Sequence, residues 1–195
     1  MDRRIARVVY GTGLVGLALL AIQAVAEERP TPSPSPRALE VLERLESNDP
    51  YERQAAFLRL EALREPGTLP AIRRFMDSKD PEARAASLRA VAAIEGAPAI
   101  HVLLEKLHRD QQPRVRRAAL LALEPLAQGH PEVLDAFLSS LRDRSPEVRM
   151  TAIDIVSRID DARARQAIRL RYKKEHERDV RRVLELAMKR LAHHD

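Results

Sequence analysis

The 195-residue sequence contains no cysteine and no tryptophan, and only 3% of its residues are aromatic. Without cysteine the chain can have no disulfide framework, no thiolate zinc site and no cysteine nucleophile. Runs of Val, Ile and Tyr are also missing, which disfavours a β-sandwich. Only six glycines are present, and the sequence contains no P-loop, no glycine-rich dinucleotide motif and no G-x-S-x-G elbow. What dominates instead is Ala, Leu and Arg, a mixture that favours helices.

Residues 1–26 have the three-part pattern of a secretory signal peptide. Three arginines (Arg3, Arg4 and Arg7) precede an apolar stretch, and Ala24-Val25-Ala26 supplies a small-x-small cleavage site. We therefore expect an extracytoplasmic protein, most simply periplasmic. The alternative is that residues 8–26 stay uncleaved and anchor the chain to the inner membrane, facing the periplasm, because 19 mostly apolar residues approach the length of one bilayer crossing.

Residues 27–36 contain a proline at alternating positions. Because proline fixes φ and removes a backbone donor, this segment is predicted to be an extended linker. The rest of the chain, residues 37–193, is predicted to be one repeat domain.

A motif of about 32 residues recurs five times in this domain. It is clearest as D-P-E-A-R-A-A-S-L from Asp80, Q-P-R-V-R-R-A-A-L from Gln112 and S-P-E-V-R-M-T-A-I from Ser145. The aligned arginines are Arg53, Arg84, Arg116, Arg149 and Arg181, spaced by 31, 32, 33 and 32 residues. A constant period of this length is the signature of a solenoid built from one supersecondary unit.

Each unit has the local signals of a helical hairpin. Asp49, Asp80 and Ser145 are placed to cap a helix whose first residue is proline, where the missing N–H costs nothing. A break rich in Gly, Pro or Asp then precedes a second apolar-periodic segment. The pattern predicts ten short helices and an all-α fold, an α-α superhelix of about four and a half to five hairpins.

The acidic-x-x-Pro-Glu-Val-Arg-x-x-Ala core of residues 141–152 resembles the HEAT-repeat family, and more closely its short subclass related to phycocyanobilin lyase subunits. The resemblance implies a stack of antiparallel helix pairs whose second helices line a concave surface. It also implies that the repeat arginine binds an acidic residue of a neighbouring turn, with Asp110 and Asp143 as the partners in the third and fourth units.

The five repeat arginines have two interpretations. One arginine per unit could form a ladder that binds phosphates or carboxylates. Because they recur at the same slot of every unit, we favour a structural role in which they satisfy loop carbonyls and acidic caps.

The candidate partner-binding residues lie on two of the predicted second helices. Residues 162–192 carry 11 basic against 4 acidic side chains, and Arg165, Arg169 and Lys173 form a basic stripe at i, i+4 and i+8. His101 and Glu105 share a helix face with His108, an arrangement that could hold a divalent metal. A solvated polar face is the simpler interpretation, so we expect no metal and no cofactor.

The sequence thus favours an exported scaffold that binds another protein through its concave surface and has no catalysis of its own. We expect a monomer that meets a membrane only through residues 8–26, if these are uncleaved. An enzyme or enzyme subunit of lyase or metal-hydroxylase type is the alternative. Binding of nucleic acid or an anionic polymer by the basic C-terminal repeats is a weaker one, because aromatic side chains for base stacking are scarce.

Overall fold

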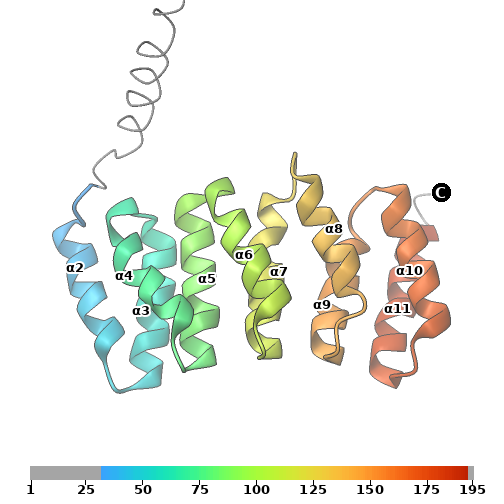
Figure 1. Ribbon diagram of the computed structural model, residues 1–195, viewed down its shortest axis with the longest axis horizontal. Coiled ribbons are helices and arrows are strands. Elements are labelled where there is room, and N and C mark those ends of the chain that lie inside the picture. The colour runs from blue at the N-terminus through green and yellow to red at the C-terminus, as the bar shows by residue number, and fades with distance from the viewer. Residues whose placement is uncertain (1–31, 193–195) are drawn as a thin grey trace, which may run out of the picture. The chain divides into compact units, whose positions relative to one another are not determined.

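The structure is a computed structural model that describes residues 32–192. These residues form ten α-helices and no β-strand (Figure 1), which confirms the all-α stack of hairpins. The helices are α2 (Pro36–Glu43), α3 (Pro50–Leu63), α4 (Leu69–Arg73), α5 (Pro81–Glu95), α6 (Ile100–Arg109), α7 (Pro113–Leu123), α8 (Pro131–Ser140), α9 (Pro146–Val156), α10 (Ala162–Lys174) and α11 (Arg178–Ala192). Short 3₁₀ turns extend several of them, at Arg44–Glu46, Pro66–Thr68, Arg74–Asp77, Ala97–Ala99 and Glu124–Leu126.

Prolines and capping side chains set where these helices begin. Proline is the first residue of six of the ten helices in the described part of the chain. The Asp49 and Asp80 carboxylates accept hydrogen bonds from the second amide of their helices, as expected for N-caps. The Ser145 hydroxyl makes no such bond. The Asp143 carboxylate instead accepts from the Ser145 amide, so the acidic residue two positions earlier orders this turn.

Nine of the ten described helices form two layers, and α2, which precedes the first unit, packs on α3. The "first helices" α3, α5, α7, α9 and α11 pack side by side along the whole stack, and small residues such as Ala86 and Ala119 allow close approach. The "second helices" α4, α6, α8 and α10 form the other layer, and each packs on the first helix of the next unit. Neighbouring second helices contact one another much less than neighbouring first helices do. Neighbouring second helices are therefore packed less tightly on one another, which leaves room for grooves between them.

A single aliphatic seam runs between the layers. Leu88, Leu120 and Ile153, each four positions after a repeat arginine, are completely buried. At the N-terminal end, Phe57 occupies the same slot and meets the ring of Phe75 edge-on, with 5.3 Å between ring centroids. In α11 the slot holds Glu185, which is exposed. A polar residue at this position closes the stack, because no further hydrophobic helix can pack there.

The turns between paired helices use left-handed backbone. Gly96 and Gly129 have φ of 66° and 81°, values that glycine adopts without steric cost. The turn after α3 has Arg64 in the left-handed helical region, with φ of 53° and ψ of 36°, whereas Gly96 has ψ of −132°. A side chain at a left-handed position is strained, so the first hairpin carries a local cost that the second and third avoid.

Helix α2 begins at Pro36, the last residue of the segment that the sequence predicts to be a linker. The Ser35 amide and hydroxyl both donate to the Glu65 carboxylate, at 2.9 and 2.8 Å, which ties this start to the loop after α3. The predicted signal segment and residues 27–31 lie outside the described residues. Within residues 32–192, no helix combines the length and apolarity needed to cross a bilayer.

Candidate functional site

The repeat arginines stand at the fourth residue of every first helix. Each uses one terminal guanidinium nitrogen to donate to the main-chain carbonyl six residues earlier, over distances of 2.6–3.1 Å. The acceptors, in chain order, are Ser47, Ser78, Asp110, Asp143 and Glu175. The arginine therefore closes the turn that leads into its own helix.

The same arginines also link each unit to the next one. Arg84 holds the Asp110 carboxylate at 2.9 and 3.1 Å, and Arg116 holds Asp143 at 2.8 and 2.7 Å. The expected carboxylate pairing is therefore shifted by one unit, because Asp110 and Asp143 give their own unit's arginine only the main-chain carbonyl. The shift follows from stacking: the turn before each first helix lies beside the preceding first helix.

The two ends of this row of arginines, Arg53 and Arg181, depart from the pattern. Arg149 still pairs with both carboxylate oxygens of Glu175, at 2.9 and 3.2 Å, whereas Arg53 reaches only one oxygen of Asp80, at 3.2 Å. Ser78 stands where the later units have an acidic residue, so the Asp80 cap must substitute for it. Arg181 has no following unit within the described residues, and its guanidinium lies 4.7 Å from the centre of the Tyr172 ring.

The burial and charge of these ion pairs indicate that they stabilise the stack of repeats. Arg116 is 3% exposed, and its hydrogen bonds to Asp143 raise the pKa of the guanidinium despite burial. Burial alone would raise the pKa of Glu175, but hydrogen bonds from Arg171, the Glu177 amide and Arg149 outweigh it and lower this pKa to about 2. Because these pairs engage the donors of Arg84, Arg116 and Arg149 inside the protein, they favour the structural interpretation of the repeat arginines over a phosphate-binding ladder.

The predicted basic stripe lies on the outer side of α10. Arg165 donates to Asp160 at 2.6 Å, Arg169 makes an interaction of its own, and Lys173 is exposed. Ala164 and Ile168 of the same helix are buried. The three basic residues are not among those on the side of α10 that faces α8, and their role in partner binding stays a prediction.

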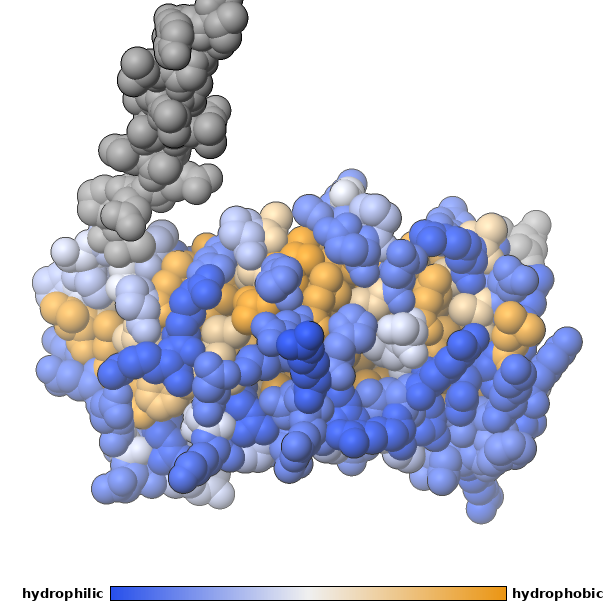
Figure 2. All heavy atoms as spheres, in the orientation of Figure 1, coloured by the Kyte–Doolittle hydropathy of each residue, from blue (hydrophilic) through white to orange (hydrophobic). Residues whose placement is uncertain are grey.

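That side borders a hollow of about 250 Å³ between α8 and α10. From α10 it is lined by Arg163, Gln166, Ala167, Leu170, Arg171 and Lys174, and from the end of α8 by Leu138, Leu141 and Arg142. At 3.6 residues per turn, these α10 residues lie roughly a third of a turn from the Arg165 stripe. We call this feature the α8–α10 groove. Figure 2 shows such hydrophobic patches between hydrophilic ridges on this face.

Sequence reasoning missed the α8–α10 groove. Its signal was Leu170, which lies between two arginines and outside the apolar stripe of Ala164 and Ile168. The side chain is 46% exposed. A leucine off the buried stripe of an otherwise basic helix indicates a surface contact, but its facing residues on α8 can be identified only in three dimensions.

The structure does bring His101, Glu105 and His108 together, around a hollow on α6. Two of them have other partners: Glu105 pairs with Arg109 at 3.4 Å, and Nδ1 of His108 lies 2.7 Å from the Leu104 carbonyl oxygen. Within residues 32–192 no three His, Asp or Glu side chains are placed to hold a metal ion together.

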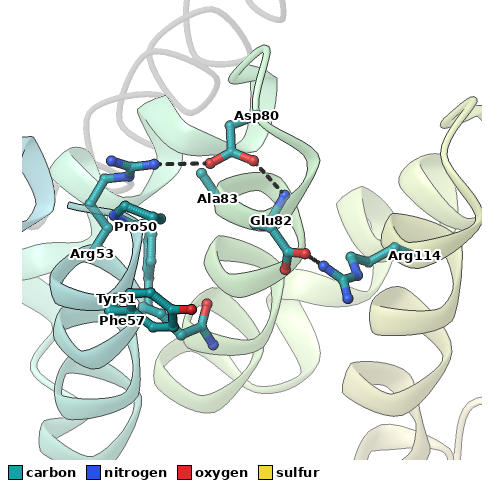
Figure 3. A pocket seen from close by; sticks show the side chains of 9 residues that line it. Pro50, Tyr51, Arg53, Phe57, Asp80, Glu82, Ala83 and Arg114 are labelled. Carbon is teal, nitrogen blue, oxygen red and sulfur yellow. Dashed lines mark hydrogen bonds and ion pairs between the residues drawn. The ribbon is translucent and has the colours of Figure 1, made fainter. Parts of the chain in front are cut away.

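A third hollow, of about 390 Å³, lies between the N-terminal ends of α3 and α5 (Figure 3). Tyr51, which is 84% exposed, and the buried Phe57 come from α3 and give it an aromatic side. Its charged side chains bind one another, because Arg53 pairs with Asp80 and Glu82 pairs with Arg114. A ligand here would meet mainly apolar surface.

Comparisons with known proteins agree with this architecture. The family model described as "HEAT repeats" matches residues 36–124 and 100–189. The fold is similar to that in the structure of the complex of CpcE and CpcF of phycocyanin lyase from Nostoc sp. PCC7120, with a TM-score of 0.64 and 24% identity over 77% of this chain and 96% of that one. It is also similar to an engineered protein, with a TM-score of 0.50 and 19% identity over 90% and 83% of the two chains. No curated protein matches the sequence.

Proposed function

The chain belongs to the HEAT-repeat family, and from that premise we propose that it is a scaffold that binds another protein along its second-helix layer and has no catalytic site of its own. The α8–α10 groove is the observation that carries this proposal. It combines the exposed Leu170 with the cationic side chains of Arg142 and Lys174. Apolar anchors bordered by charges are typical of protein–protein contacts.

Three other features of the described residues support the same choice of face. The repeat arginines are engaged in joining consecutive units, and the exposed Glu185 makes the C-terminal end of the stack polar. On the first-helix layer, the exposed leucines Leu58 and Leu121 are separated by Arg89, which pairs with Glu61 at 3.7 Å. The extended side surface of a solenoid is also where recognition normally takes place.

Site-specific photocrosslinking in the cells that make the protein tests this proposal. A photoreactive residue at Leu170 or at His101 should form covalent adducts with a protein partner. The same residue at Leu121, which is 42% exposed on the first-helix layer, is the matched control and should give few or none. A complete lack of protein adducts at both second-helix positions would contradict the proposed scaffold function.

We also propose that the chain is exported to the periplasm, on the basis of the signal pattern in residues 1–26. The test is the mass of the protein purified from its native compartment. A chain that begins at Glu27 in the periplasmic fraction supports cleavage, and an intact chain in the membrane fraction supports the anchor. An intact chain in the cytosol contradicts both.

One observation favours a second candidate, a role as an enzyme subunit like that of the structurally similar phycocyanin lyase. The hollow beside Tyr51 and Phe57 has a volume within the roughly 300–1,000 Å³ typical of small-molecule sites. Mixing the purified chain with phycocyanobilin should shift the absorption spectrum if this hollow holds a bilin, and Tyr51→Ala should weaken the shift. An unchanged absorption spectrum would contradict the enzyme-subunit role and favour the scaffold function.

A further inference from the structure

The α8–α10 groove has more positive charge than its surroundings neutralise. Within residues 32–192, Arg142 and Lys174 make no ion pair, and both are exposed. Arg171 does bind a carboxylate, at 2.6 Å, but that carboxylate belongs to Glu175, which also holds Arg149. Since Arg142, Arg171 and Lys174 lie at the C-terminal ends of their two helices, one end of the groove is cationic and can accept further carboxylates.

The floor of the groove is apolar. Leu138 and Ala167 are half-buried, and Leu141 is buried beneath them. Of the six large hydrophobic side chains that are exposed in the described part of the chain, Leu170 is the one that lies on a second helix. Covering it would remove apolar surface from water, which stabilises a complex.

The dimensions of the groove favour a few side chains of a macromolecule over a small ligand. Its volume of about 250 Å³ is below the range typical of small-molecule pockets. The lining of α10 extends from Arg163 to Lys174, a rise of about 16 Å or three helical turns. A helix laid along this length would present apolar residues at i, i+3 or i+4, and i+7.

Building on the proposed function, we infer that the α8–α10 groove binds an acidic amphipathic helix of the partner protein, antiparallel to α8 and α10. Its apolar face covers Leu138 and Leu170. Its N-terminal turn carries Asp or Glu and lies beside Arg142 and Lys174. Antiparallel packing suits all three helices, because acidic residues are favourable in the first turn of a helix and cations in the last.

The partner segment can be identified and measured directly. In cells, a photoreactive residue at Leu170 of the full chain marks the segment, and mass spectrometry of the adduct gives its sequence. A synthetic peptide of that sequence is then titrated onto the purified full chain. We expect Arg142→Glu with Lys174→Glu to weaken the affinity at least about tenfold, because interfacial charge reversal opposes binding. Raising NaCl from low to high concentration should also weaken binding to the unmodified chain.

Two controls make the result specific. Arg59→Glu with Arg117→Glu produces the same change in net charge on the first-helix layer, where both side chains are exposed and lack ion pairs to described residues. This pair should alter the affinity less than about twofold. All exchanged side chains are exposed, so circular dichroism should show unchanged helicity.

The other outcomes reject the inference, and they show whether the proposed function fails with it. A marked segment that is basic or uncharged, or an affinity unchanged by the groove reversal, rejects the acidic helix while a protein partner remains. Adducts at His101 but not at Leu170 do the same. If a single-stranded oligonucleotide or phosphatidylglycerol vesicles bind more tightly than the peptide and lose binding in the groove variant, the occupant is a different polyanion. Lack of protein adducts at both positions rejects the proposed function as well.

Discussion

Arg116 and Asp143 form a two-pronged ion pair across the boundary between two repeats, with nitrogen–oxygen distances of 2.8 and 2.7 Å. The arginine is 3% exposed and also donates to the carbonyls of Asp110 and Gln111. One side chain thus closes its own turn and holds the following one. The same relationship recurs from Arg84 to Asp110 and from Arg149 to Glu175.

The first prediction concerns this pair. Asp143→Ala leaves the buried Arg116 without its carboxylate, so we expect the free energy of unfolding to fall by about 3 kcal/mol or more. Urea denaturation followed by circular dichroism measures the loss. Glu46→Ala is the control, since its pair with Arg74 has both side chains more than 60% exposed and should contribute less than about 1 kcal/mol. Equal losses in the two variants would contradict a special role for buried links.

The second prediction is a pH dependence. Folding lowers the pKa of Glu175 from 4.5 to about 2 and also lowers the pKa values of Asp110 and Asp143, because arginine hydrogen bonds outweigh burial. The unfolded chain therefore binds more protons in this range, and stability falls as the pH drops from about 4.5 towards 2. Glu175 alone should contribute about 3 kcal/mol at neutral pH.

Urea midpoints at pH 7, 4 and 3 check this second prediction. Glu175→Gln should be less stable at pH 7 and should lose less stability than the unmodified chain as the pH falls. Stability curves that run parallel for the two proteins would show that this carboxylate is not the source of the acid sensitivity.

The third prediction concerns the left-handed turn residues. Arg64→Gly should stabilise the chain by roughly 0.5–1 kcal/mol, because glycine adopts positive φ without strain. Gly96→Ala should destabilise it by about 1–3 kcal/mol, because φ of 66° with ψ of −132° is a backbone conformation that side chains other than glycine rarely adopt. Apart from its chain neighbours, no heavy atom lies within 4 Å of the added methyl group, so this cost is conformational. Thermal melts of both variants give the signs, and an Arg64→Gly protein that melts lower would refute the strain.

The fourth prediction tests the polar end of the stack. Glu185→Leu places an aliphatic side chain where Leu120 and Ile153 are buried in the internal units. The variant should self-associate with rising concentration, because its end resembles an unfinished repeat. Light scattering across a concentration series measures this, with Glu185→Gln as the control. A strictly monomeric leucine variant would show that Glu185 is not what closes the end.

The fold could be predicted because its signals are local and repeated. Each unit has its own signals for the turns around its helices. These are proline at the first helical position, glycine at Gly96 and Gly129, and an arginine about every 32 residues. Asp110 does bind the third unit's arginine, but only through its main-chain carbonyl. Its carboxylate binds Arg84 instead, because sequence distance does not reveal which of two nearby guanidinium groups a carboxylate faces. The basic stripe on α10 stays a prediction as a binding site, and the α8–α10 groove was not predicted. A groove depends on the separation of two helices, and no residue pattern within one unit encodes that separation.

Each ion pair between a repeat arginine and a carboxylate joins one unit to the unit that follows it. Both the arginine and the acidic residue recur with the repeat. A chain of this kind can gain or lose a whole hairpin by duplication or deletion without any new pairing being invented, because the joint on either side of the change is already present. The number of hairpins is thus free to vary while the joints stay the same. The number of units then sets the length of the second-helix layer that a partner can contact.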